Sequence, residues 1–382
     1  MGVIGRGVPI AIAILTAATA TTATASASGG PPPGKFIANS TSWISSSTGW
    51  VLGQVSCGKN KVCSQVRETA NGGKTWQTIG NIPAPIPKLG NPGAGITEIR
   101  FASAEIGWAF GPDLYRTADG GKSWKKMPLP GDGKQVLDLA TTATDVYIVV
   151  SPCAYETGIC GSKPLTAWRA LNVKPVWTAH SWTLMPVKLH INVSANVSAL
   201  GNTVYVVNSN LDGPNHPSQF FASTDGGKTF AARPVPCTAD EEKTLIQAVP
   251  YSSAKVGLLC DGNPGFSKAV KAVYLSADNG KTDKFAGIMG QFGIQAGLAI
   301  SPTGKLAVES WSDGSFIYIN DNHKAKWYMI IGSGDGGAGF NDITYVSPTT
   351  AFVVFGPADM FSGYGQLYAT HDAGRHWALV KI

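Results

Sequence analysis

The chain has 382 residues, of which 43% are hydrophobic and only 14% are charged. This composition excludes a chain that is disordered through high charge and low hydrophobicity, and it indicates a buried core. The formal net charge is +6, but the basic residues are scattered and their longest run is the pair Lys125 and Lys126. The sequence therefore lacks the basic footprint of a nucleic-acid-binding protein.

Residues 1–28 have the features of a secretory signal peptide. Arg6 supplies a positive start, residues 8–20 are apolar, and small residues at 23–27 fit the cleavage rule. The apolar run is shorter than the ~18 residues that a spanning helix needs, and no longer run follows, so no integral membrane segment is predicted in the mature chain. We expect a secreted or extracytoplasmic protein in which residues 29–382 form one domain.

One eight-residue pattern recurs along this domain and is here called the turn octamer. It begins with Thr or Ser, has Asp or Asn third and Gly fifth, and in four of its five copies ends in Trp or Phe. The copies are residues 69–76, 117–124, 223–230, 276–283 and 370–377, and their third residues are Asn71, Asp119, Asp225, Asp278 and Asp372. Degenerate copies at 179–182 and 320–327 complete a period of about 50 residues, which gives seven units.

Each turn octamer is predicted to form a hairpin turn, because an Asp side chain accepts backbone N–H groups and Gly adopts positive φ without penalty. Short alternating runs such as 107–111 and 114–117 precede the second copy. Four short strands per unit are typical of a propeller blade. The sequence predicts an all-β fold, a seven-bladed β-propeller of four-stranded antiparallel blades, with the second blade built from 96–101, 107–111, 114–117 and 123–127.

The other blades are expected at 36–80, 134–187, 190–236, 237–290, 291–331 and 338–382. The last unit has its own outer strand at 377–382, so no strand exchange with the first unit is expected. Closure of the ring would then rest on packing between the first and seventh blades, helped by Phe36 and Ile37.

Six cysteines lie in the mature part, an even number for an oxidising compartment. Fifteen pairings are possible, but their clustering favours three local disulfides: Cys57 with Cys63, Cys153 with Cys160, and Cys237 with Cys260. A metal site is the alternative, which the lack of histidine at ligand spacing disfavours. We expect no metal and, without a Walker loop or dinucleotide fingerprint, no cofactor.

The turn octamer resembles the Asp-box, or bacterial neuraminidase repeat. With a preceding Gly-Trp, the Asp-Gly-Gly-Lys form is especially similar to the photosystem II stability and assembly factor family of propellers. In the families it resembles, the box sits on a hairpin remote from the active or binding face. The resemblance therefore implies a structural role for the third residues of the turn octamers, and it implies assembly or chaperone-like binding as a function.

In such a propeller the turn octamers lie on one face and the long irregular segments on the other. Those segments are 56–62, 151–164, 209–218, 261–269 and 357–365, together with the connections 81–95 and 332–339. Their acids and aromatics are candidate contacts for a protein or carbohydrate ligand: Tyr155, Glu156, Asp212, His216, Phe266, Asp359 and Tyr364. Disulfides that pin these loops suit binding, because preorganisation lowers its entropic cost, and they equally suit protection from proteolysis.

Four polar residues on inner strands are weaker candidates for catalysis. Aligned blades place Glu98 and Asp342 at one position, with Arg100 and Asp138 near them, so all four are expected to line the central channel. Paired carboxylates there could cleave a glycoside, or they could simply line a solvated channel.

An exo-sialidase is the most specific hypothesis for an enzyme. Such an enzyme needs three arginines around the substrate carboxylate. The mature chain has Arg67, Arg100, Arg116, Arg169, Arg233 and Arg375, three of which lie at or in turn octamers, and the Arg-Ile-Pro segment of sialidases is absent. The sequence favours a binding or scaffold module for a protein or glycan. A glycoside hydrolase is the alternative.

Overall fold

The computed structural model describes residues 35–58, 61–86, 94–154, 163–172, 181–190, 194–209, 218–238, 244–262, 269–289, 293, 295–311, 314–320, 327–333, 339–356 and 365–382. Within these ranges the chain forms 28 β-strands in seven four-stranded antiparallel sheets and no helix. That part of the chain accordingly holds no helix that could cross a membrane. The expected signal peptide lies outside the described residues.

Each sheet uses four consecutive strands, so the seven-bladed propeller is confirmed. The first blade contains β1 (Ile37–Trp43), β2 (Gly49–Gly58), β3 (Lys61–Thr69) and β4 (Gln77–Ile82). The second contains β5 (Glu98–Phe101), β6 (Gly107–Phe110), β7 (Leu114–Thr117) and β8 (Lys125–Lys126). The third contains β9 (Gln135–Thr141), β10 (Asp145–Ser151), β11 (Thr166–Leu171) and β12 (Thr183–Leu184). The other four contain β13 (Ala195–Leu200), β14 (Thr203–Asn208), β15 (Gln219–Ser223), β16 (Ala231–Arg233); β17 (Leu245–Ser252), β18 (Lys255–Asp261), β19 (Lys271–Ser276), β20 (Lys284–Met289); β21 (Gln295–Ile300), β22 (Leu306–Trp311), β23 (Ser315–Asn320), β24 (Tyr328–Ser333); β25 (Phe340–Tyr345), β26 (Ala351–Phe355), β27 (Gln366–Thr370) and β28 (Ala378–Val380).

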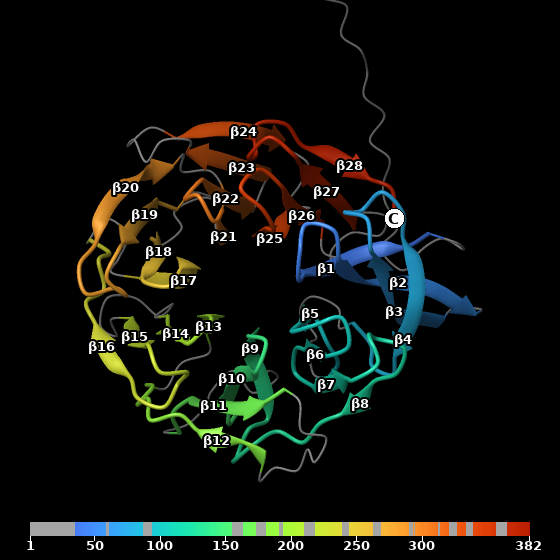
Figure 1. Cartoon of the computed structure of the whole chain (residues 1–382), viewed down its shortest axis with the longest axis horizontal. Coiled ribbons are helices and arrows are strands. Elements are labelled where there is room, and N and C mark those ends of the chain that lie inside the picture. Colours follow the sequence, from blue (N-terminus) through green and yellow to red (C-terminus); the bar gives the residue numbers. More distant parts are fainter. Residues whose placement is uncertain are drawn as a thin grey trace, which may run out of the picture.

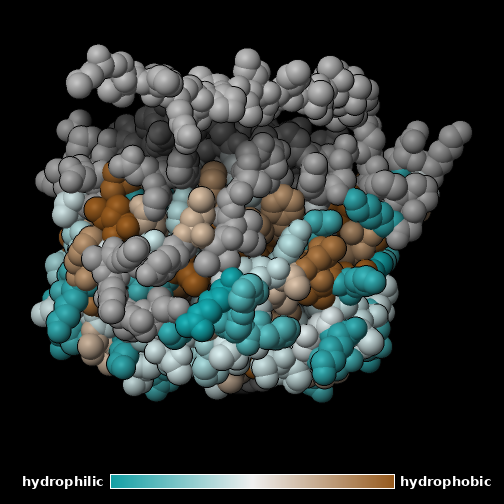
Figure 2. Space-filling model, turned by 90° about the horizontal axis from the view of Figure 1, so that it is seen from above, coloured by the Kyte–Doolittle hydropathy of each residue, from teal (hydrophilic) through white to brown (hydrophobic). Residues whose placement is uncertain are grey.

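The first strand of every blade faces the middle of the ring and the fourth lies at the rim (Figure 1). The second strands are apolar on both faces because neighbouring blades cover both sides, as in β6 and β10. Among the fourth strands, β8 and β12 are exposed, and β16 and β28 are largely so. Seen from the side of β24 and β28, hydrophobic residues form a band at mid-height above a hydrophilic lower edge (Figure 2).

The ring closes without strand exchange, as the sequence predicted. Phe36 and Val51 of the first unit pack in one buried cluster with Phe352 and Leu367 of the seventh. The backbone N–H of Ala38 also donates to a carbonyl oxygen beyond β26, that of Gly365, at 2.8 Å. Side-chain packing and this backbone bond therefore both contribute to the seam between the first and seventh blades.

The turn octamers form tight, internally hydrogen-bonded turns between the third and fourth strands. In the second blade, Thr117 Oγ1 accepts the N–H groups of Asp119 and Gly121 at 3.3 and 2.9 Å. Asp119 Oδ1 in turn accepts the N–H of Ser123 at 2.9 Å. The same bonds recur in the other four copies.

Each turn octamer also packs on the preceding blade. A Cβ atom at Gly280 would lie 2.5 Å from the ring of Phe220, in the blade before it, so only glycine fits there. In the third and sixth blades, which lack a full octamer, Asn172 and Asn320 make this link. Asn172 Oδ1 accepts Trp108 Nε1–H at 3.0 Å, and Asn320 Nδ2 donates to the carbonyl of Ala286 at 3.2 Å.

Candidate functional site

The turn octamers and the turns between first and second strands share one face of the ring. The N–H groups of Gly120, Gly226 and Ala373 each donate, at 2.8 or 2.9 Å, to a carbonyl in the first turn of their own blade. The connections between second and third strands leave from the opposite end of those strands. This opposite face is here called the loop-bearing face.

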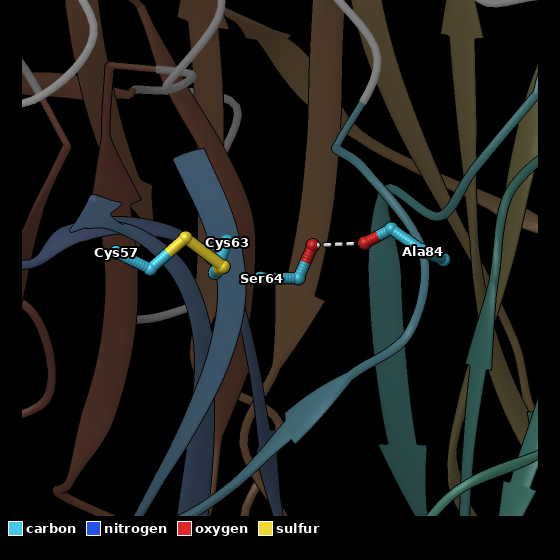
Figure 3. Close-up of a disulfide and its surroundings, with 4 residues drawn as sticks. All are labelled: Cys57, Cys63, Ser64 and Ala84. Atoms are coloured by element: carbon cyan, nitrogen blue, oxygen red, sulfur yellow. Dashed lines mark hydrogen bonds between the residues drawn. A yellow bond between two sulfur atoms is a disulfide. The ribbon is translucent and has the colours of Figure 1, made fainter. Parts of the chain in front are cut away.

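The seven candidate contact residues predicted for the loop-bearing face, Tyr155, Glu156, Asp212, His216, Phe266, Asp359 and Tyr364, all lie outside the described residues. The hairpin of β2 and β3 extends toward the loop-bearing face. The disulfide between Cys57 and Cys63 joins these strands near their ends (Figure 3). Ser64, next to the bridge, donates a hydrogen bond to the carbonyl of Ala84. The hairpin is therefore held both within itself and to the connection that follows β4.

The Cys237–Cys260 disulfide is also confirmed, and both of its residues are buried. Cys153 is disulfide-bonded, but its predicted partner Cys160 lies outside the described residues.

A cavity of about 1210 Å³ occupies the central channel, and the first strands of the blades form most of its wall. All four residues predicted to line the channel do so: Glu98, Arg100, Asp138 and Asp342. Two acids that the sequence analysis did not select, Asp261 and Glu309, line it as well.

Arg100 lies between two of these carboxylates. Its Nη2 is 2.5 Å from Glu98 Oε2 and 3.1 Å from Asp342 Oδ1. Burial lowers the pKa of Arg100, but Asp342 and Glu98 outweigh it, and the net shift is upward. Burial raises the pKa of Glu98 to about 7, although the charge of Arg100 opposes the shift.

Asp342 and Asp138 are engaged by the neighbouring inner strands. Asp342 Oδ2 accepts the N–H of Thr41 in the next blade at 2.7 Å and the hydroxyl of Ser40 at 2.6 Å. Asp138 Oδ2 accepts the N–H of Val197 in the next blade at 2.8 Å, and its Oδ1 accepts the N–H of Leu139.

The same bond recurs around most of the channel, and we call this arrangement the acceptor ring. In five of the seven blades, one residue of the inner strand presents an oxygen to the backbone N–H of the next blade, at a fixed position in the strand. Ser40 bonds Ile99, Asn196 bonds Ala248, and Gln247 bonds Leu298, in addition to the two aspartates above. Glu98 stands at this position too, but it accepts a hydrogen bond from Arg100, and the N–H of Leu139 in the next blade donates to Asp138 instead.

In the sixth blade the position is Gly297, and Glu309 of β22 takes over. A Cβ atom at Gly297 would lie 2.5 Å from Glu309 Oε1, so the glycine leaves room for a side chain arriving from the second strand. Glu309 accepts backbone hydrogen bonds from Ile343 and Asp342 of β25. Burial nevertheless raises the pKa of Glu309 well above its usual value. The signal in the sequence was a lone acid in an otherwise apolar second strand.

Asp261 ends β18 directly opposite Lys271 of β19. Burial raises the pKa of Asp261 to about 7, against the charge of Lys271. Lys271 is fully buried, and its Nζ donates to the carbonyls of Ala269 and Gly293 at 3.1 and 2.6 Å.

The six arginines of the expected mature chain do not converge. Arg100 alone among them lines the channel cavity. Arg169 and Arg233 donate to carbonyls in the turn octamers of the following blades, those of Gly226 and Asn279. The three-arginine site of a sialidase is therefore not formed.

No family model matches this chain, and no curated protein matches it. Solved structures do. YCF48 bound to D1 peptide is 18% identical with a TM-score of 0.49, over 77% of this chain and 86% of that chain. An ulvan lyase, a polysaccharide lyase, is 12% identical with a TM-score of 0.53, over 85% and 90%. Sqt1 from Saccharomyces cerevisiae is 10% identical with a TM-score of 0.50, over 90% and 85%. At these identities the likeness concerns the fold alone.

Proposed function

We propose that this chain is an extracytoplasmic binding module that captures a protein or glycan ligand on its loop-bearing face, over the mouth of the channel. The observation that carries this proposal is the engagement of the channel aspartates. Asp138 and Asp342 each use both carboxylate oxygens in bonds to the protein, so neither is placed to exchange a proton with a substrate.

The pinned β2–β3 hairpin supports the same conclusion. It is closed by the Cys57–Cys63 bridge, and Val62 at its tip is 44% exposed. A preordered hairpin with an exposed apolar side chain can bind a partner with little loss of conformational entropy. The two disulfides among the described residues are consistent with an oxidising compartment.

The direct test is a glycan array and a pull-down with the purified chain. We expect a hit that is lost when residues 56–62 are replaced by a two-residue Asn-Gly turn, or when 151–164 is shortened. The control is Lys74→Ala in a turn octamer on the other face, which should retain the hit. A hit that survives both loop changes would place the ligand elsewhere and contradict the proposal.

Glycan cleavage is the second candidate, and Glu98 is the observation that favours it. Its raised pKa, near 7, suits a general acid, and its carboxyl lies within reach of the same guanidinium as Asp342. Incubation with fluorogenic sialosides and a panel of plant glucans tests it. Turnover by the unmodified chain that is lost in Glu98→Gln would contradict a function limited to binding and would support a glycoside hydrolase.

A further inference from the structure

We propose that the channel receives a positively charged group, the lysine or arginine side chain of a basic peptide, entering from the loop-bearing face. This inference rests on the proposed binding function and specifies its ligand.

The charge of the channel is opposite to that of the chain. Among the residues that the structure describes, the charged ones that line the cavity are five acids and one base: Glu98, Asp138, Asp261, Glu309, Asp342 and Arg100. The whole chain, in contrast, carries 30 basic and 24 acidic residues. Because a cleft with low-dielectric walls focuses the field of its charges, this segregation favours a cation inside the channel.

Two carboxylate oxygens of wall residues, Glu309 Oε2 and Asp261 Oδ1, are buried and have no hydrogen-bond partner in the described part of the chain. Both residues are more than nine-tenths buried, with relative exposures of 7% and 9%. Buried polar atoms are nearly always hydrogen-bonded in proteins, so two unmatched acceptors on one cavity indicate a missing donor. Glu309 reaches the cavity over Gly297, and Asp261 stands where β18 leads to the loop-bearing face.

The ligand chemistry follows from these acceptors. Lysine presents three donors and arginine five, with no acceptor, which matches a wall of carboxylates. Arg100, the one cation among the described residues of the wall, is already bonded to Glu98 and Asp342, so it is not offered to an anionic ligand such as an acidic sugar. The cavity of about 1210 Å³ is large enough for a side chain with the flanking peptide backbone.

Binding of a cation should be coupled to release of protons. Burial raises the pKa of Glu98 and of Asp261 to about 7 and that of Asp138 to about 6, while Arg100 and Lys271 are the positive groups that face them. A second cation in the channel favours the ionised carboxylates and lowers these pKa values. Affinity should therefore rise with pH through this range and then level off.

The experiment measures fluorescence anisotropy of a short Gly/Ser peptide with a central lysine and of its twin with Nε-acetyl-lysine. We expect the full chain to bind the lysine peptide roughly tenfold or more tightly than the acetylated twin, with an affinity that falls as salt is added. Equal affinity for the two peptides would overturn the proposal, as would binding that is independent of pH.

Two conservative variants locate the site. Glu309→Gln and Asp261→Asn should each lower affinity for the lysine peptide several-fold, while Glu105→Gln, an exposed acid in the turn after β5 on the opposite face, should not. Thermal melts verify folding, and if Glu309→Gln does not fold, Asp261→Asn and the acetylated peptide decide. Unchanged affinity in a folded Asp261→Asn variant contradicts the site. A ligand whose binding requires the β2–β3 hairpin but is unaffected by Glu309→Gln and Asp261→Asn would support the proposed function and contradict this inference.

Discussion

Arg100 and Asp342 are 242 residues apart in sequence, yet their side chains meet at 3.1 Å inside the ring. Arg100 belongs to the second blade and Asp342 to the seventh, so their ion pair spans the first blade. Asp342 also accepts the N–H of Thr41 in that blade. This pair therefore supports the seam at which the ring closes.

Replacement of Arg100 tests that support. Arg100→Met leaves the carboxyls of Glu98 and Asp342 without their shared cation, and we expect a loss of about 2 kcal/mol in the free energy of unfolding near neutral pH, since the pair is only partly buried. Arg100→Lys keeps the charge and should cost less. Urea unfolding measures both variants, and equal losses would show that geometry rather than charge is what matters.

The free energy of unfolding should depend on pH through two acids of the channel, Glu98 and Asp138. The pKa of Glu98 is raised by burial from 4.5 to about 7, and that of Asp138 from 3.8 to about 6. Between about pH 4 and 7 the folded state then binds more protons than the unfolded state, so the free energy of unfolding falls as pH rises.

At lower pH the aspartates of the turn octamers have the opposite effect on the free energy of unfolding, which there rises with pH. The N–H of Thr282 lowers the pKa of Asp278 to about 2, so this stabilisation is present above about pH 4 and is lost as pH falls toward 2. Urea midpoints measured across pH should therefore be highest in mildly acid solution. Glu98→Gln should flatten the decline above that maximum, and a decline of unchanged steepness would contradict the assignment.

The hydroxyl of Thr117 tests the turn octamer. It accepts two backbone N–H groups and is 1% exposed. Thr117→Val keeps the shape but leaves the N–H of Gly121 without its partner, which we expect to cost about 2 kcal/mol. The matched control is the exposed Thr78→Val, whose effect on the thermal midpoint should be small.

Ala373 offers a stabilising change. Its φ is 64°, at a position where three other turn octamers have Gly with similar φ values. Because an L side chain is strained in this region, Ala373→Gly should raise the free energy of unfolding by up to about 1 kcal/mol. A loss of stability in chemical denaturation would mean that the methyl group packs usefully.

The Cys237–Cys260 bridge should matter more to stability than Cys57–Cys63. It closes a loop of 23 residues rather than 6, and loop-closure entropy gives about 3 and about 2 kcal/mol respectively. Paired Cys→Ser variants compared by thermal unfolding test the order, and ligand binding by the Cys57/Cys63 variant shows whether the hairpin bridge serves recognition.

Much of the fold was predictable because the turn octamer carries its own geometry. Asp119 and the glycine that follows it specify a turn by local chemistry alone, and the spacing of the copies gave the seven blades. The meeting of Glu98, Arg100 and Asp342 was also predictable, since aligned inner strands place equivalent residues around one axis.

Glu309, Asp261 and Asn172 could not be found in that way. Glu309 enters the channel from a second strand, and only the missing side chain of Gly297 in another strand makes room for it. Asn172 bonds the third blade to the second, as a turn octamer does elsewhere, although the sequence around it does not match the octamer pattern. Such replacements depend on contacts between blades, which a local pattern does not encode.

No sheet takes a strand from another part of the chain, and this has a consequence for how the ring can be rebuilt. At the joint between the seventh and first blades, Asp342 of β25 accepts the N–H of Thr41 in β1, which is the bond that Asp138 and Gln247 make at their own joints. A circular permutant, with β28 linked to β1 and new ends opened between β12 and β13, should retain every strand pairing and assemble the same ring.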